Sequence, residues 1–165
     1  MKITFLGGGN MANALIGGML KQGFAAADIT VIDPGSAARD KLERTYAVNC
    51  LETGEMLDNI GDLLVLAVKP QQMKDAVTPL VDKLGNAVVV SIAAGLDLAT
   101  LARFLGGHRK IVRCMPNTPA LIGAGITGLC PLPEVSAAER EAADCVLSAV
   151  GSTVWIDNEG RMDGV

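Results

Sequence analysis

The chain has 165 residues, half of them apolar, and a formal net charge of -4. This length fits one domain of ordinary size, and the negative charge argues against a nucleic-acid partner. Because no apolar run approaches the ~20 residues that cross a bilayer, and no basic start precedes an apolar signal core, we expect no membrane partner and a cytoplasmic location.

Cysteine and histidine usage gives no sign of a metal site. The chain has a single histidine, and its four cysteines lie far apart without a C-x-x-C pair. Zinc-ligand spacing is therefore absent. We expect buried free thiols in a reducing compartment: Cys50, Cys114, Cys130 and Cys145.

The first 33 residues carry the strongest pattern. Residues 2–6 are an apolar run of strand formers, and three glycines follow. From Met11 the apolar period becomes i, i+3, i+4, which predicts a helix that stops at Gly23. Residues 29–32 predict a second strand, which ends at Asp33. Strand, glycine turn, helix, strand and acid is the order of a dinucleotide-binding unit, and Gly7-x-Gly9-x-x-Ala12 matches its G-x-G-x-x-A fingerprint.

Each fingerprint position has a physical role. The first glycine allows a tight turn, the second lets a pyrophosphate approach the backbone, and the alanine lets the helix pack closely on the strand. The helix start adds unpaired N–H groups and a partial positive charge. The alternative is a glycine-rich connection with another ligand or none. We predict cofactor contacts from Leu6, Gly7, Gly8, Gly9, Asn10, Met11 and Ala12.

The rest of the chain alternates strands and helices. We predict a helix at 36–46, a short strand at 47–49, a short helix at 53–59 and a buried strand at 63–68. Residues 71–84 predict an amphipathic helix that breaks near Val77, because Pro79 lies inside it. Later predictions are strands at 87–91, 110–115, 125–130 and 152–156, and helices at 97–105 and 136–150. Ser136 and Glu139 form a capping-box pattern at the last helix. The fold class is therefore α/β, a Rossmann-type doubly wound, mostly parallel sheet with helices on both faces.

In such a sheet, ligands bind outside the carboxyl ends of the strands, where the strand order reverses. Asp33 follows the second strand, where its carboxylate can accept both ribose hydroxyls of NAD. Its charge would repel the 2′-phosphate of NADP. Ser36 and Arg39 lie close enough in sequence to bind that phosphate if Asp33 turns away. The alternative for Arg39 is a solvated helix charge.

The strand at 63–68 is followed by Lys69 and Pro70. Pro70 suits the first turn of a helix and biases Lys69 to an extended backbone. We predict that the main chain from Ala67 through Val68 to Lys69 lies beside the ribose and nicotinamide half of the cofactor. Lys69 is either a catalytic or phosphate-binding lysine or a solvent-exposed residue at a strand end.

A third strand end runs from Met115 to Pro119. Its two prolines hold the segment rigid, and Asn117 and Thr118 offer neutral hydrogen-bonding groups next to the place where hydride is delivered. We predict that Met115 and Asn117 contact the cofactor, and that Asn117 and Thr118 line the nicotinamide or substrate site. The alternative is a polar turn.

Four stretches together resemble the nucleotide-binding domain of the pyrroline-5-carboxylate reductases, over essentially the whole chain. They are G-G-G-N-M-A at 7–12, A-V-K-P at 67–70, S-I-A-A-G at 91–95 and, most specific, R-C-M-P-N-T-P-A at 113–120. The resemblance implies reduction of 1-pyrroline-5-carboxylate to L-proline, the last step of proline biosynthesis. It also implies NADPH as the usual cofactor, with NAD possible because of Asp33, and a homodimer or higher homo-oligomer.

The chain departs from that family in two ways. Family members generally have an asparagine in the segment before A-V-K-P that contacts the cofactor, whereas residues 52–55 here read E-T-G-E. The family also has a helical domain that forms the dimer and most of the substrate pocket. We expect an NAD(P)-binding domain at 1–156 and only the start of the helical domain at 157–165. The chain is then a fragment or needs a partner, and poor stability or association is expected.

The implied chemistry needs no acid–base pair in this domain. A cyclic imine accepts hydride as its protonated iminium, so the cofactor carries the chemistry. We assign no proton-transfer role to Asn117 or Thr118, and the catalytic residues stay unknown. Two alternatives remain: a nucleotide-binding fragment that is inactive alone, or a different Rossmann reductase acting on hydroxyacids or with a deazaflavin.

Overall fold

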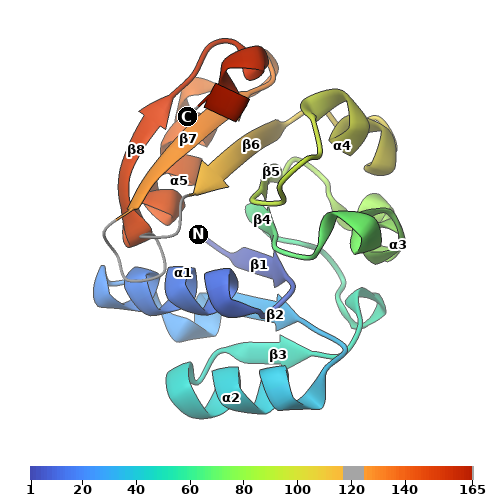
Figure 1. The fold of residues 1–165 in the computed structure, drawn as a ribbon. Coiled ribbons are helices and arrows are strands. Elements are labelled where there is room, and N and C mark those ends of the chain that lie inside the picture. Colours follow the sequence, from blue (N-terminus) through green and yellow to red (C-terminus); the bar gives the residue numbers. More distant parts are fainter. Residues whose placement is uncertain (117–124, 165) are drawn as a thin grey trace.

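A computed structural model of the chain describes residues 1–116 and 125–164. Within these residues one sheet has the strand order β3-β2-β1-β4-β5-β6-β7-β8 (Figure 1). The β6–β7 pair is antiparallel and the other described pairs are parallel. The strands are β1 (Ile3–Leu6), β2 (Ile29–Ile32), β3 (Asn49–Leu51), β4 (Leu63–Leu66), β5 (Val88–Ser91), β6 (Ile111–Pro116), β7 (Gly125–Pro131) and β8 (Gly151–Trp155).

Helices cover both faces of this sheet. The helices are α1 (Asn10–Lys21), α2 (Ser36–Tyr46), α3 (Met73–Val77), α4 (Leu98–Phe104) and α5 (Ala137–Leu147). One apolar core includes residues of α1, α2 and α5, and the other includes residues of α3 and α4. Figure 1 shows α1 and α5 on one side of the sheet and α3 and α4 on the other. The predicted doubly wound Rossmann-type fold is confirmed.

The strand order explains where a ligand can enter. The chain runs outward from β1 through β2 to β3, and then returns to place β4 on the other side of β1. The connections after β1 and β4 therefore leave in opposite directions. Every residue of β1 and of β4 is buried, as expected for strands covered on both faces. The crevice predicted by the strand-order rule lies at the carboxyl ends of these two strands.

The third strand was predicted two residues too early. The prediction of a strand at 47–49 is wrong, because β3 spans Asn49–Leu51. Ala47 instead ends α2 in the left-handed conformation, with φ of 58°, and its N–H donates to the carbonyl of Glu43. A residue in that conformation ends a helix and does not extend a strand. The helix predicted at 53–59 is reduced to a 3₁₀ turn, Gly54–Met56.

Other local predictions are confirmed. The segment predicted as one interrupted helix at 71–84 consists of a 3₁₀ turn (Pro70–Gln72), α3 and a second 3₁₀ helix (Thr78–Lys83). The capping box at the start of α5 is present, with Ser136 and Glu139 bonding each other's backbone N–H groups. A 3₁₀ turn, Ser148–Val150, follows α5 and completes the predicted length.

The cysteines are free, but their burial is not uniform. Cys114 and Cys130 are buried, as predicted. Cys50 is partly buried, and desolvation, with the charge of Glu43 next, raises its pKa to about 11. Cys145 is exposed, so the prediction that all four cysteines are buried is wrong. No helix in the described ranges is both long enough and apolar enough to cross a membrane.

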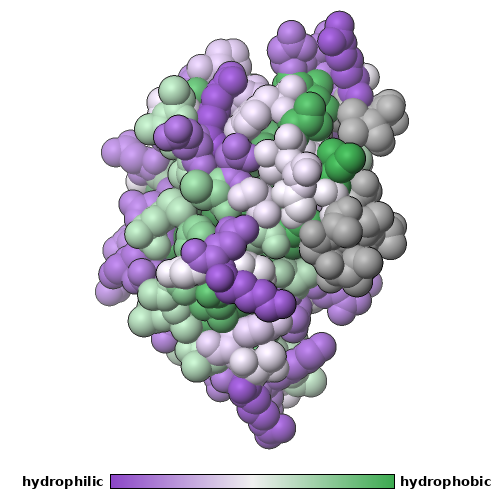
Figure 2. Space-filling view, turned by 90° about the vertical axis from the view of Figure 1, so that its left-hand side faces the viewer, coloured by the Kyte–Doolittle hydropathy of each residue, from purple (hydrophilic) through white to green (hydrophobic). Residues whose placement is uncertain are grey.

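The sheet ends at β8 in an exposed edge. Alternate residues of β8 are exposed, and Val154 on β8 and Ile126 on β7 have exposed fractions of 44% and 51%. Figure 2 shows hydrophobic atoms gathered at the upper right of the face turned to the viewer. This apolar surface belongs to the half of the sheet that lies away from β1.

Candidate functional site

A cleft of about 540 Å³ opens at the carboxyl ends of β1 to β4. It lies where the strand order reverses, as the topology requires. The glycine turn, the ends of β2, β3 and β4, and the helical segment after β4 supply its lining: Leu6, Gly7, Gly8, Gly9, Ile32, Asp33, Pro34, Glu52, Thr53, Gly54, Ala67, Val68, Lys69, Gln72, Asp75, Ala76 and Pro79.

The glycine turn is held between two strands. Gly7 has φ of +103°, and a Cβ at this position would lie 2.7 Å from the carbonyl oxygen of Ala67. Its N–H donates to the carbonyl of Ile32 at 2.8 Å. Gly9 is different, because nothing lies within 4 Å of the place where its Cβ would be. The first glycine therefore permits the tight turn, and the second leaves the backbone open to a ligand.

The start of α1 is available to an anion. Gly9 is the N-cap, no side chain caps this end, and the first turn holds no acidic residue. The helical hydrogen bonds begin with the N–H of Asn13, which donates to the carbonyl of Gly9 at 2.9 Å. Earlier N–H groups of the turn have no partner within the helix. Of the predicted contacts here, Asn10 is exposed, Met11 is partly buried, and Ala12 is a buried residue of α1 that belongs to the apolar core.

Asp33 lies at the cleft, but its carboxylate is already engaged. Oδ2 accepts the N–H of Gly8, and Oδ1 accepts the N–H of Gly35, both at 2.8 Å. The Nη1 of Arg39 donates to the main-chain carbonyl of Asp33 at 2.8 Å. Arg39 is therefore fixed beside the acid, whereas Ser36 is exposed at the first position of α2. Neither Arg39 nor Ser36 is among the lining residues of the cleft.

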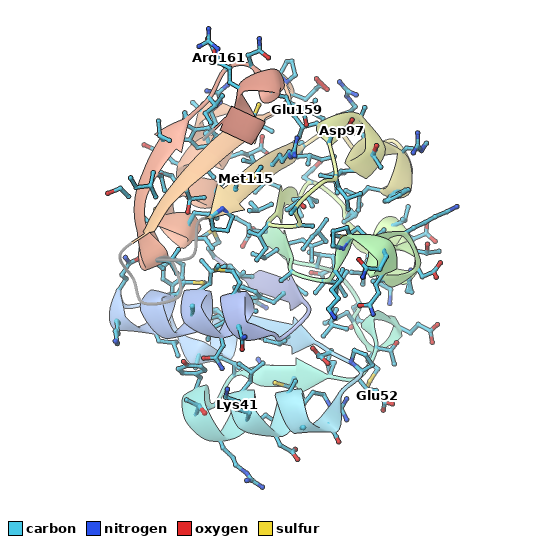
Figure 3. All side chains as sticks on the ribbon, viewed as in Figure 1. Lys41, Glu52, Asp97, Met115, Glu159 and Arg161 are labelled. Atoms are coloured by element: carbon cyan, nitrogen blue, oxygen red, sulfur yellow. The ribbon has the colours of Figure 1, made fainter. Side chains whose placement is uncertain are left out.

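The other predicted strand ends are placed differently. Ala67, Val68 and Lys69 line the cleft directly after β4, and Pro70 begins the next 3₁₀ turn. Lys69 is exposed. Met115 is partly buried on β6 and lies well away from the cleft residue Glu52 in Figure 3. Asn117 and Thr118 lie outside the described residues.

Sequence reasoning omitted several lining residues. Glu52, Thr53 and Gly54 were missed as a strand end because β3 was predicted two residues too early. With β3 ending at Leu51, the strand-end rule would have included them. The residues after β4, from Gln72 to Pro79, belong to a predicted helix whose cleft-facing side no sequence pattern identified.

Residues 52–54 form one wall of the cleft, and hydrogen bonds hold this segment in place. Lys83 Nζ donates to the carbonyl of Gly54 at 2.8 Å, and Thr53 Oγ1 accepts the N–H of Glu55 at 2.9 Å. A Cβ on Gly54 would lie 2.3 Å from Leu80 Cδ2. A larger residue at position 54 would therefore require Leu80 to move. Among the described residues, no group of three or more histidines, cysteines or acids could hold a metal ion.

Known proteins resemble the chain in both sequence and fold. A family model described as "NADP oxidoreductase coenzyme F420-dependent" matches residues 2–95. The chain is 45% identical, over 165 residues, to a pyrroline-5-carboxylate reductase of Pseudomonas aeruginosa, covering 99% of the chain and 60% of that protein. The resemblance inferred from the motifs is confirmed.

Solved structures agree. A pyrroline-5-carboxylate reductase from Coxiella burnetii superimposes with a TM-score of 0.91 at 33% identity, over 97% of the chain and 60% of that structure. A Plasmodium falciparum pyrroline carboxylate reductase with NADP bound gives 0.85 at 26% identity, over 99% of the chain and 60% of that structure. The chain thus spans about three fifths of the length of these relatives.

Proposed function

The chain belongs to the family of oxidoreductases described as NADP oxidoreductase coenzyme F420-dependent, and from this premise we propose that it is the cofactor-binding part of a pyrroline-5-carboxylate reductase. The reaction is the reduction of 1-pyrroline-5-carboxylate to L-proline. The observation that carries the proposal is the similarity to the Pseudomonas aeruginosa reductase, which extends over 99% of the chain. The R-C-M-P-N-T-P-A stretch at 113–120 supports the same assignment.

The cleft fits a dinucleotide. Gly9 leaves open space where a side chain would stand, and the uncapped start of α1 offers N–H groups to a pyrophosphate. When bound, the reduced nicotinamide supplies the hydride. The residues of this chain bind and orient the cofactor: the glycine turn holds the phosphates, and the main chain of Ala67, Val68 and Lys69 borders the cleft beyond them.

We propose NADPH as the preferred cofactor, with NADH accepted more weakly. Arg39 does not line the cleft, but its Nη1 donates to the carbonyl of the lining residue Asp33, and Ser36 is the first residue of the same helix. The Asp33 carboxylate accepts two backbone N–H groups, which reduces its repulsion toward a 2′-phosphate. Removing Arg39, as in Arg39→Met, is expected to weaken NADPH binding about tenfold and NADH binding much less.

The assignments of the nicotinamide-site residues, the domain bounds, the location and the oligomeric state rest on this proposal. Met115, Asn117 and Thr118 border the nicotinamide or substrate, residues 1–156 form the nucleotide-binding domain, and residues 157–165 begin a helical domain. The enzyme acts in the cytoplasm as a homodimer or higher homo-oligomer. Because the chain spans only 60% of its relatives' length, a second candidate is a domain that binds the cofactor without turnover by itself.

Cofactor titration followed by an assay tests the proposal. The 165-residue chain is titrated with NADPH, with NADH and with a reduced deazaflavin by fluorescence, and then assayed with 1-pyrroline-5-carboxylate. NADPH binding without turnover supports the binding-domain candidate, and turnover supports a complete site. Binding of the deazaflavin alone, or of no nucleotide by a folded chain, would contradict the proposal. Gly9→Val is the matched variant, because no protein atom lies within 4 Å of the Cβ that it adds, and it is expected to lose NADPH while remaining folded.

A further inference from the structure

The main-chain N–H, the carbonyl and both carboxylate oxygens of Asp33 each have a hydrogen-bond partner. Its own N–H donates to the carbonyl of Leu51 at 2.9 Å, and its carbonyl accepts Arg39 Nη1 at 2.8 Å. Its two carboxylate oxygens accept the N–H groups of Gly8 and Gly35, each at 2.8 Å. These partners come from the glycine turn, from the end of β3 and from the start of α2. Through its main chain and side chain together, this one residue at the end of β2 therefore joins three segments that border the cleft, and its carboxylate joins two of them, the glycine turn and the start of α2.

The contact with Gly8 is the important one for the turn. Gly8 lies between Gly7, which is fixed against Ala67, and Gly9, which is open to the cleft. A Cβ on Gly8 would lie 2.8 Å from Leu42 Cδ1, so the turn also packs on α2. The Gly8 N–H is bonded to a carboxylate oxygen, and bonds to charged acceptors are about twice as strong as neutral ones. This bond restricts how the backbone before Gly9 can rotate.

We propose that Asp33 is a positioning residue, which fixes the glycine turn through the Gly8 N–H and thereby aims the phosphate-binding backbone of Gly9 at the cofactor. This inference rests on the proposed function, and it changes the role given to the acid. An acid that only reads the ribose hydroxyls discriminates between NADH and NADPH. An acid that holds the turn affects both cofactors alike, because both present the same pyrophosphate.

Three variants test the proposal. Asp33→Ala removes both hydrogen bonds, and Asp33→Asn keeps one oxygen acceptor, so its effect should be intermediate. The control is Asp40→Asn, an exposed acid on α2 outside the cleft. For each chain, dissociation constants for NADPH and for NADH are measured by cofactor fluorescence, and the exchange rates of the Gly8 and Gly35 amide protons are measured by NMR without cofactor.

The expected result for Asp33→Ala is a loss of about tenfold for each cofactor, with the NADPH to NADH ratio changed by less than about threefold. Exchange at Gly8 and Gly35 should accelerate, while Asp40→Asn should match the wild type. Two outcomes would overturn the inference: NADH binding weakens while NADPH binding is kept or strengthened, or neither affinity changes.

The result would differ if the proposed function, rather than the role of Asp33, were wrong. In that case the wild-type chain would bind neither nucleotide, whatever residue stands at position 33. The exchange rate of the Gly8 amide would then still decide whether Asp33 holds the turn. If Asp33→Ala does not fold, the graded loss in Asp33→Asn carries the same test.

Discussion

The two halves of the sheet use their charged residues differently. In the half formed by β6 to β8, charges pair with one another: Arg109 with Glu134 at 2.6 Å, Lys110 with Glu139 at 3.0 Å, and Arg113 with Glu159 at 3.2 Å. In the half formed by β1 to β4, the charges that line the cleft take no part in the ion pairs of the described residues.

The Arg113–Glu159 ion pair is the clearest case of charged side chains that join elements of the fold. The Arg113 side chain is buried on β6, and Glu159 Oε2 also accepts the N–H of Leu98 at 2.6 Å, at the start of α4. Figure 3 shows Glu159 beside Asp97, the N-cap of that helix. At the cleft, by contrast, the Asp33 carboxylate accepts hydrogen bonds from two backbone N–H groups, and Lys69 is exposed. In the half formed by β6 to β8, ion pairs join elements of the fold. In the half formed by β1 to β4, charged side chains and backbone donors lie at the cleft.

The largest expected effect follows from Gly7→Ala. The added Cβ meets the carbonyl of Ala67 in a backbone conformation that alanine rarely adopts, so we expect a destabilisation of about 2–4 kcal/mol and loss of NADPH binding. Urea unfolding followed by the fluorescence of Trp155 measures the first effect, and NADPH titration measures the second.

Gly9→Ala is the matched control for this change. Its Cβ meets no protein atom, so stability should hardly change while NADPH binding weakens. A comparable loss of stability in Gly9→Ala would remove the distinction between a glycine required by the fold and one required by the ligand.

A smaller effect is expected at the opposite half of the sheet. Glu159→Gln removes the carboxylate that pairs with Arg113 Nη1 at 3.2 Å, and we expect a destabilisation of about 2 kcal/mol with unchanged NADPH binding. The control is Glu134→Gln, whose ion pair with Arg109 is exposed and should matter much less. Equal losses in the two variants would contradict a special role for the buried pair.

Acid should weaken this same region. Hydrogen bonds from Thr100 lower the pKa of Asp97 below its ordinary value of 3.8. Because the folded state favours the ionised form, its contribution to stability is complete above that value and is lost as pH falls through the lower folded pKa. Urea midpoints measured from about pH 5 down to about pH 2 should therefore fall less steeply in Asp97→Asn and in Thr100→Ala than in the wild type. Parallel curves would show that Asp97 has no part in the acid sensitivity.

The smallest effect is local. Ser136→Ala removes the side-chain half of the capping box, and we expect a destabilisation of about 1 kcal/mol without a change in cofactor binding. Ser152→Ala, an exposed position on β8, is the control and should fall within about 0.5 kcal/mol of the wild type. An equal effect at both positions would mean that the cap contributes nothing of its own.

Contacts between residues near in sequence were predictable. The glycine turn, the buried strands β4 and β5, the break at Pro79 and the capping box each depend on local spacing or on conformational limits of single residues. The error at β3 came from a local detail of another kind, the left-handed Ala47 that ends α2. A residue other than glycine in that conformation gives no clear signal in the sequence.

The order of the elements, the Rossmann-type fold and the nucleotide fingerprint could be predicted from the sequence, because periodicity and glycine spacing act over a few residues. Three features depend on contacts made in the folded chain: the Asp33 carboxylate bonds Gly8 and Gly35, residues 52–54 form a wall of the cleft, and Arg113 pairs with Glu159. Gly8 and Asp33 are 25 positions apart, and Arg113 and Glu159 are 46 positions apart. Such partners meet only after the strands have paired, and no local pattern records which of the available donors a carboxylate then meets.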